Sequence, residues 1–202
     1  MRDDGNWSVA MRIDVIAWDL GGVWVPSIGE ILERCFPMTG ERRMTFRQLM
    51  FGEIEESVFW SRYLVGSKWE GRLDEWMDET RIREPDIDPA LLRLYDRLAA
   101  RGIAHGIISN NCGSWTALAM KKIGRHFEPI VISATAHALK PYRKIFQEFL
   151  RRSRKDPKDV LLIDDNPRNI AGAKVVGMRG VVFQSVEQLE RDLADLLFDR
   201  SS

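Results

Sequence analysis

The stretch Ile13-Asp14-Val15-Ile16-Ala17-Trp18-Asp19-Leu20-Gly21-Gly22-Val23 decides the fold of this chain. An apolar run rich in β-branched residues ends at an acid, and two glycines follow. This pattern predicts a buried strand that carries Asp19 at its carboxyl end, and then a tight turn whose backbone can approach a ligand closely. Open α/β folds bind their ligands at the carboxyl ends of parallel strands. Asp19 is therefore the first candidate for a functional residue.

Apolar runs and helical patterns alternate through the second half of the chain. One helix is expected to begin at Asp88-Pro89, because aspartate is a favoured N-cap and proline suits the first helical position. Strands that alternate with helices are joined by right-handed crossovers into a parallel sheet, and uniformly apolar strands fit burial on both faces. We predict strands at residues 103–108, 130–132, 160–163 and 181–183, and helices at 88–101, 115–123, 145–150, 171–176 and 186–197.

The expected fold class is α/β, with a Rossmann-like parallel sheet and helices on both of its faces. Residues 11–25 and 85–202 would form this core. The intervening residues, 26–84, show helical spacing of apolar side chains without strand-like runs, and we predict about four short helices there as an inserted unit. Residues 1–10 are polar and are expected to form a disordered N-terminal extension.

Charge and cysteine content narrow the function classes. The 30 basic and 30 acidic residues cancel, which gives no strong attraction to nucleic acid or to an anionic membrane. No apolar run approaches the roughly 20 residues needed to span a bilayer. The two cysteines lack metal-like spacing and fit a reducing compartment. We therefore expect a cytoplasmic protein without nucleic-acid or membrane partners, either a monomer or a homodimer.

Four polar clusters each follow the end of an apolar run. Because the carboxyl ends of parallel strands meet at one edge of a sheet, these clusters should converge in space. Together they supply a candidate nucleophile, a hydroxyl, a cation and a pair of acids, which suits a phosphoryl group held with Mg²⁺. The clusters are Asp19, Ser109 with Asn110, Lys140, and Asp164 with Asp165.

The motifs around these clusters resemble those of the haloacid dehalogenase (HAD) superfamily, in the subgroup with a small helical C1-type cap after the first strand. Their order and spacing cover nearly the whole chain from Ile13 to Phe183, and the last motif is the most specific. The DxGG variant is similar to that of sugar-1-phosphate phosphatases. The motifs are WDLGGVWV, IISNN, LKPYRKIFQ and VLLIDDNPRNIAGAKVVGM.

This resemblance implies a phosphatase with a small phosphorylated substrate and Mg²⁺ as cofactor. Asp19 would be the nucleophile that forms an aspartyl-phosphate. Asp19, the carbonyl of Gly21 and Asp164 would ligate Mg²⁺. Ser109 and Asn110 would bind the phosphate oxygens that are not transferred.

The resemblance assigns two further roles in the core and one to the inserted helices. Lys140 would neutralise charge on Asp19 and on the phosphoryl group. Asp165 would orient Lys140 or a metal-bound water. Residues 26–84, called the cap segment below, would close over the site, exclude water and select the substrate.

Gly21 departs from the DxD pattern usual for phosphatases of this family, in which a second acid protonates the leaving group and then activates water. General acid–base catalysis is typically worth roughly 10²–10⁴-fold. A sugar 1-phosphate would suit a site without that acid, because its anomeric oxygen is a better leaving group than an ordinary alcohol. Either the protein is slow, another group takes the place of that acid, or the leaving group needs little help. We favour the last explanation, which makes a sugar phosphate the expected substrate.

Two other functions remain open. A 2-haloacid dehalogenase also uses an aspartate nucleophile without the second acid, although the pair Asp164-Asp165 speaks against it. A catalytically weakened relative could bind a phosphorylated ligand or a partner protein. Trp24 follows the nucleophile loop closely and is a candidate for substrate contact, or otherwise for packing. The three histidines share no ligand spacing and are expected to be structural or surface residues.

Overall fold

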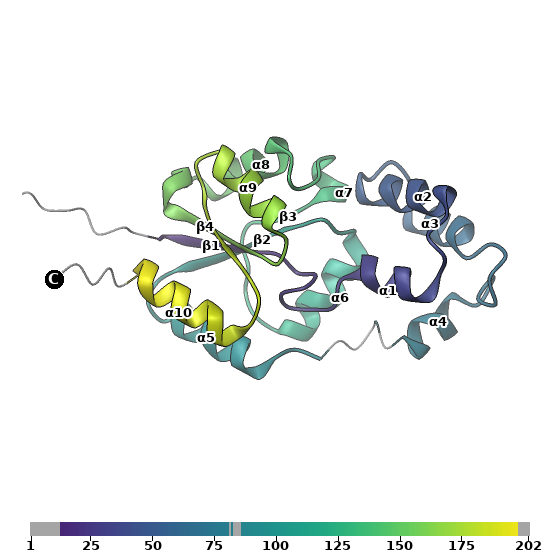
Figure 1. The fold of residues 1–202 in the computed structure, drawn as a ribbon, viewed down its shortest axis with the longest axis horizontal. Coiled ribbons are helices and arrows are strands. Elements are labelled where there is room, and N and C mark those ends of the chain that lie inside the picture. Colours follow the sequence, from purple (N-terminus) through teal and green to yellow (C-terminus); the bar gives the residue numbers. More distant parts are fainter. Residues whose placement is uncertain (1–12, 81, 83–85, 198–202) are drawn as a thin grey trace, which may run out of the picture.

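The computed structural model describes residues 13–80, 82 and 86–197, so the predicted extension at residues 1–10 lies outside the described part. Five parallel strands form one sheet in the order β3-β2-β1-β4-β5, with β1 at its centre (Figure 1). The predicted α/β class is therefore confirmed. The strands are β1 (Val15–Trp18), β2 (Ala104–Ser109), β3 (Ile130–Ile132), β4 (Val160–Asp164) and β5 (Arg179–Val182).

Helices cover both faces of this sheet, and side chains of β1 alternate between them. Ile16 and Trp18 pack on the side of α5, α6 and α10, whereas Val15 and Ala17 pack on the side of α8 and α9. No helix in the described part of the chain is long and apolar enough to cross a bilayer. The helices are α5 (Pro89–Ala99), α6 (Gly113–Ile123), α7 (Ser133–Ala136), α8 (Arg143–Ser153), α9 (Pro167–Val175) and α10 (Val186–Leu197), with a 3₁₀ turn at Pro157–Asp159.

The cap segment contains four helices, as its helical spacing predicts. They are α1 (Ile28–Cys35), α2 (Gly40–Met50), α3 (Glu56–Tyr63) and α4 (Leu73–Glu79). They lie together beyond one end of the sheet, next to α6 and α7 (Figure 1). Their aromatic side chains form a separate hydrophobic cluster, which also takes in Trp115 of α6.

The short helix α7 has no counterpart among the predicted elements, and α9 begins four residues earlier than its apolar pattern indicates. Proline occupies the first helical position, and the side chain of Asn166 accepts a hydrogen bond of 3.0 Å from the backbone N–H of Arg168. An N-cap followed by proline starts a helix irrespective of where its apolar stripe begins. The early start places Asn169 on the first turn of α9, directly beside the end of β4.

His105 is a buried core residue of β2, only 5 % exposed. The indole N–H of Trp18 donates to its Nδ1 at 3.0 Å, so this nitrogen carries no proton. The ring lies against Tyr95, with 4.0 Å between centroids. Burial lowers the pKa of His105 to about 4, from an ordinary value near 6.5.

Acidification should therefore destabilise the fold through His105. The unfolded chain takes up the proton below about pH 6.5, whereas the folded chain resists it until about pH 4, so stability falls between these values by about 3 kcal/mol. Glutamine does not titrate. We therefore expect the free energy of unfolding of His105→Gln to fall by about 3 kcal/mol less than that of the native chain between pH 6.5 and pH 4. Urea unfolding at pH 7 and at pH 4 measures both slopes, and equal slopes would contradict the assignment.

Candidate active site

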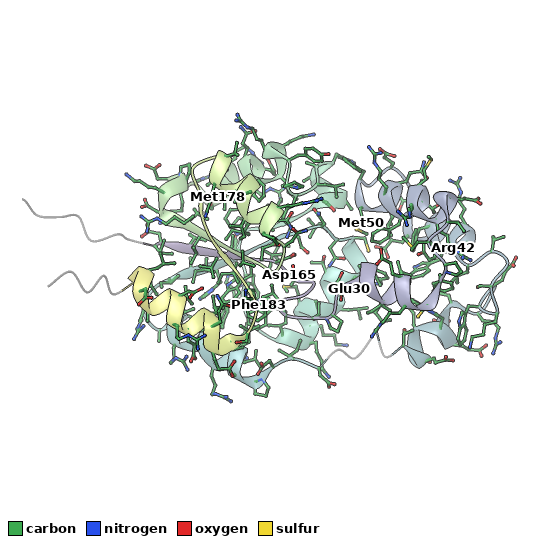
Figure 2. The ribbon with its side chains drawn as sticks, viewed as in Figure 1. Glu30, Arg42, Met50, Asp165, Met178 and Phe183 are labelled. Atoms are coloured by element: carbon green, nitrogen blue, oxygen red, sulfur yellow. The ribbon has the colours of Figure 1, made fainter. Side chains whose placement is uncertain are left out.

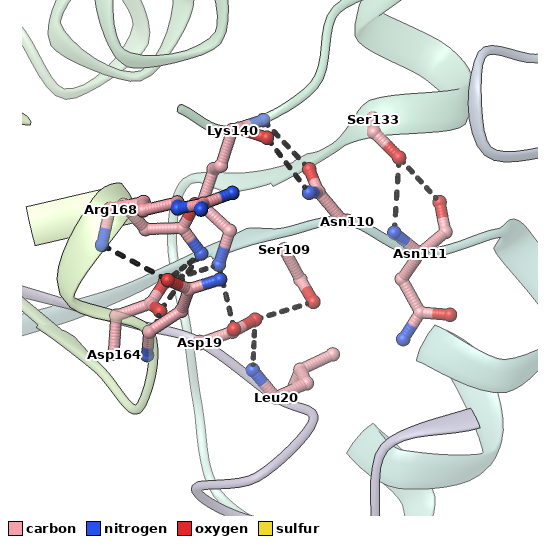
Figure 3. A network of polar contacts seen from close by, with 11 residues as sticks. Asp19, Leu20, Ser109, Asn110, Asn111, Ser133, Lys140, Asp164 and Arg168 are labelled. Carbon is pink, nitrogen blue, oxygen red and sulfur yellow. Dashed lines mark hydrogen bonds and ion pairs between the residues drawn. The ribbon is translucent and has the colours of Figure 1, made fainter. Parts of the chain in front are cut away.

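Asp19 follows β1 directly and lies at the carboxyl edge of the sheet. Its backbone N–H donates to the carbonyl of Ile163 at 2.9 Å, which extends the ladder between β1 and β4. Its Oδ1 accepts hydrogen bonds from the backbone N–H of Leu20 at 2.7 Å and from the hydroxyl of Ser109 at 2.8 Å (Figure 3). Burial raises the pKa of Asp19 to about 6, even though neighbouring Lys140 lowers it.

Lys140 lies behind Asp19, and its ammonium group is fully buried. The Nζ atom is 2.8 Å from Oδ2 of Asp19 and 2.6 Å from Oδ2 of Asp164. Burial alone lowers the pKa of Lys140, but the two carboxylates raise it above its usual value, so the side chain stays charged. Its main chain is held by Asn110, whose Oδ1 accepts from Lys140 N at 2.8 Å and whose Nδ2 donates to Lys140 O at 3.1 Å.

Asp164 is the last residue of β4 and is completely buried. Its Oδ1 accepts hydrogen bonds of 2.9 Å from the backbone N–H of Asn166 and from Nδ2 of Asn169. Asn169 also donates to Oδ2 at 3.1 Å. The sequence interpretation missed Asn169, whose only signal is its place in the motif after β4, one turn into a helix that starts earlier than expected.

Asp165 points differently from its neighbour. Its side chain lies against Gly22, and a Cβ atom added to Gly22 would sit 2.2 Å from Oδ2 of Asp165. Gly22 also has a φ of +78°, so glycine is needed there on both counts. Asp164, and not Asp165, contacts the ammonium of Lys140. Of the two roles predicted for Asp165, this geometry speaks against orientation of Lys140, and orientation of a metal-bound water stays a prediction. Burial raises the pKa of Asp165, and the Asp164 carboxylate raises it further.

Three carboxylates in this arrangement fit a divalent cation. One oxygen each of Asp19, Asp164 and Asp165 lies within 4.8 Å of the other two. Carboxylate and carbonyl oxygens are the ligands that Mg²⁺ prefers, and the mutual repulsion of three acids favours a bound cation. The loop at Gly21 borders the same space and would offer a backbone carbonyl.

A cavity of about 340 Å³ opens in front of Asp19, between the edge of the sheet and the cap segment. Core residues on its wall include Asp19, Ser109, Asn110 and Asp165, which the sequence predicted to converge. Lys140 and Asp164 lie behind this wall. The opposite wall is formed by α1 and α6, with Ile28, Glu30, Ile31 and Arg34 from α1 and Trp115 and Leu118 from α6.

Trp24 lies outside this cavity, contrary to the expectation of a substrate contact. The side chain is 2 % exposed and belongs to the core cluster. Its ring meets those of Trp18 and Phe127 edge to face, with centroid separations of 5.3 and 5.7 Å. Because the turn after Asp19 directs Trp24 back under the sheet, it packs the core instead of lining the site.

Residues at three positions of the cap segment contact the core close to the cavity. Oε1 of Glu56 accepts a hydrogen bond of 3.0 Å from the backbone N–H of Ser114, at the start of α6. The carbonyl of Phe51 lies 2.8 Å from Nδ1 of His137. The ring of Trp60 packs against that of Trp115, with centroids 5.7 Å apart. In this structure the cap segment therefore covers the site.

A family model described as haloacid dehalogenase-like hydrolase matches residues 32–183. The chain belongs to this family. Its fold matches the HAD family enzyme BT-2542 of Bacteroides thetaiotaomicron, solved with magnesium and inorganic phosphate, at a TM-score of 0.68 and 21% identity over 85% of this chain and 94% of that one. It also matches L-2-haloacid dehalogenase from Xanthobacter autotrophicus, at a TM-score of 0.61 and 18% identity over 91% and 83%.

One curated relative is similar in sequence to part of this HAD-like hydrolase. It is flavin mononucleotide hydrolase 1 of Arabidopsis thaliana, which is 31% identical over 75 residues. The match covers 37% of this chain and 31% of the relative, so it spans under a third of that protein. The two structural neighbours, at 18% and 21% identity, establish the fold that they share with this chain.

Proposed function

We propose that this HAD-like hydrolase is a Mg²⁺-dependent phosphatase that acts on a small phosphorylated metabolite through an aspartyl-phosphate on Asp19. The observation that carries the proposal is the buried ammonium of Lys140 between Oδ2 of Asp19 and Oδ2 of Asp164, directly behind a cavity. A cation fixed beside a nucleophilic carboxylate stabilises the charge that gathers on a transferring phosphoryl group.

Each polar residue of the site has a role in this reaction. Asp19 attacks phosphorus, with its carboxylate held in place by the N–H of Leu20 and the hydroxyl of Ser109. Ser109 and Asn110 line the space for the phosphate oxygens that are not transferred. The side chain of Asn110 also holds the backbone of Lys140 in place by accepting a hydrogen bond from its N–H. Asp19, Asp164 and the Gly21 carbonyl would hold Mg²⁺, which supplies Lewis acidity toward the phosphoryl oxygens.

The cavity wall suits a metabolite with both polar and apolar parts. Isoleucines of α1 and Trp115 of α6 line one side, and Glu30 and Arg34 add charge. A sugar phosphate is the substrate class that we propose, because an anomeric oxygen leaves without much help at a site where position 21 is glycine. The partial likeness to a flavin mononucleotide hydrolase makes flavin mononucleotide a useful second probe, because its phosphate is an ester of a primary alcohol and lacks an anomeric oxygen.

The dehalogenase alternative shares this fold, since L-2-haloacid dehalogenase is among the structural neighbours. Three carboxylates around one point support a cation site and therefore the phosphatase. The division into core and cap segment is part of the proposal, and so is a cytoplasmic location, which the free thiols of Cys35 and Cys112 support.

The first test is phosphate release from a panel of phosphorylated metabolites that includes a sugar 1-phosphate and flavin mononucleotide. We expect release with Mg²⁺ and its loss in excess chelator, because three carboxylates with only the ammonium of Lys140 beside them keep a net negative charge that would repel the incoming phosphate. Chloride release from 2-chloropropionate is measured in parallel. Chloride without phosphate would establish the dehalogenase, and neither product would favour a binding protein.

A further inference from the structure

The proposed phosphatase needs a group that moves protons, and the usual position has no side chain. An anomeric oxygen needs less help than an ordinary alkoxide when its bond to phosphorus breaks, but either leaving group must gain a proton. The water that later attacks the aspartyl-phosphate must lose a proton whatever the substrate is. A positioned acid–base group is typically worth roughly 10²–10⁴-fold in such steps. Gly21 supplies none.

The space beside Gly21 is filled by the start of α1. A Cβ atom at position 21 would lie 3.2 Å from Cα of Ser27, 3.5 Å from its Cβ and 3.7 Å from its hydroxyl oxygen. A contact of 3.2 Å with a backbone atom is tight, so a side chain at position 21 would require Ser27, at the start of α1, to shift by a few tenths of an ångström. The glycine therefore lets the first cap helix begin against the nucleophile loop.

The polar side chains in the first turn of α1 do not cap the helix. Ser27-Ile28-Gly29-Glu30 has the pattern of a capping box, in which serine and glutamate each satisfy a backbone N–H of the other. In the structure Ser27 makes no side-chain cap, and within the described part of the chain the carboxylate of Glu30 accepts no hydrogen bond. Both residues line the cavity in front of Asp19 instead.

Glu30 faces the acidic side of the site. Figure 2 shows it on α1, across the gap between cap segment and core from Asp165. Both side chains line the same cavity, and the Glu30 carboxylate is the weakest of the influences that raise the pKa of Asp165, after burial and the Asp164 carboxylate. Ser27 is an alcohol, too weak an acid to replace a carboxyl group, and Asp165 belongs to the candidate cation site. Glu30 is thus the carboxyl group that α1 contributes to the cavity wall and that has no place in the candidate cation site.

We infer that Glu30 is the general acid and base of the reaction, supplied by the cap segment in place of a side chain at position 21. This inference rests on the proposed phosphatase activity. In the first step Asp19 bonds to phosphorus, the bond from phosphorus to the leaving oxygen breaks, and the carboxyl proton of Glu30 goes to that oxygen. In the second step water attacks phosphorus, its proton goes to the Glu30 carboxylate, and Asp19 is released with phosphate.

The test compares two leaving groups in single-turnover experiments with Mg²⁺. Ethyl phosphate needs protonation of its leaving alkoxide, whereas p-nitrophenyl phosphate releases a stable anion that does not. We expect Glu30→Gln to lower the rate of the first step for ethyl phosphate by about 10²-fold or more, and to leave the first release of nitrophenolate unchanged. Hydrolysis of the aspartyl-phosphate should slow for both substrates.

Glu33→Gln is the matched control, because Glu33 is exposed on the same helix and does not line the cavity. It should behave as the native chain with both substrates. If Glu30→Gln reacts with ethyl phosphate at the native rate, Glu30 is not the general acid. The same conclusion follows if the rate of the first step falls equally for both substrates. In either case the proposed phosphatase activity is unaffected. If the native chain releases phosphate neither from these esters nor from the metabolite panel, the phosphatase itself fails, and the role of Glu30 fails with it.

Discussion

Asp19→Asn is expected to lower kcat for Mg²⁺-dependent phosphate release by at least about 10⁴-fold, the scale seen when a covalent nucleophile is removed. An amide oxygen attacks phosphorus far more weakly than a carboxylate does. The substitution keeps an acceptor for the N–H of Leu20 and the hydroxyl of Ser109, so the geometry of the loop should persist. Phosphate release under saturating substrate, with thermal unfolding as a check on folding, measures the effect.

Asp14→Asn provides the comparison for this variant. Asp14 lies just before the same strand, at the opposite edge of the sheet, where it pairs with Lys155 at 2.9 Å. Removal of this charge should leave turnover as it is. If Asp19→Asn kept the turnover of the native chain, the aspartyl-phosphate would be excluded, and Asp19 would be at most a ligand of the cation.

The convergence of the site was predictable because it follows from topology. Asp19, Ser109 and Asp164 each end an apolar run, and parallel strands deliver such ends to one edge irrespective of their separation along the chain. The register confirms this, since β1 pairs with β2 on one side and with β4 on the other. Lys140 reaches the same point from a loop, and only its motif indicated that.

The partners within the site were less predictable. Adjacent residues at the end of a strand point in different directions, so Asp164 meets Lys140 while Asp165 lies against Gly22. The spacing of the two acids carries no information about which of them faces the lysine. The sequence alone likewise did not show where the side chain of Trp24 points, so both substrate contact and packing were consistent with it. In the structure, the turn after β1 directs Trp24 into the hydrophobic core.

Contacts between the cap segment and the core also cannot be predicted from the local spacing of apolar residues. Helical spacing predicted four helices in residues 26–84, but it could not predict that Trp115 of α6 joins their hydrophobic cluster. It also could not show that Ser27 fills the space beside Gly21. Both contacts join segments that periodicity treats separately, and they determine which cap side chains face Asp19.

Lys140→Met should destabilise the fold by about 3–5 kcal/mol, the usual result when one partner of a buried ion pair is removed. Methionine has a similar volume, but it leaves the carboxylates of Asp19 and Asp164 buried without a cation. In the native chain the ammonium of Lys140 lowers the pKa of Asp19. Without it, burial raises this pKa further above 6. At Asp19 the folded variant then binds more protons than its unfolded chain. Since His105 acts equally in both proteins, the stability of the variant should rise relative to that of the native chain as the pH falls from 7 toward 6.

Urea unfolding of the Mg²⁺-free protein measures this effect, with Lys158→Met as the exposed control that should change stability by less than about 0.5 kcal/mol. A double-mutant cycle with Asp19→Asn isolates the cause. If repulsion and desolvation of two uncompensated carboxylates destabilise the variant, the loss of Lys140 must cost less once Asp19 is neutral. An equal cost in both backgrounds would mean that Lys140 stabilises the fold by packing, and that Asp164 alone compensates its charge.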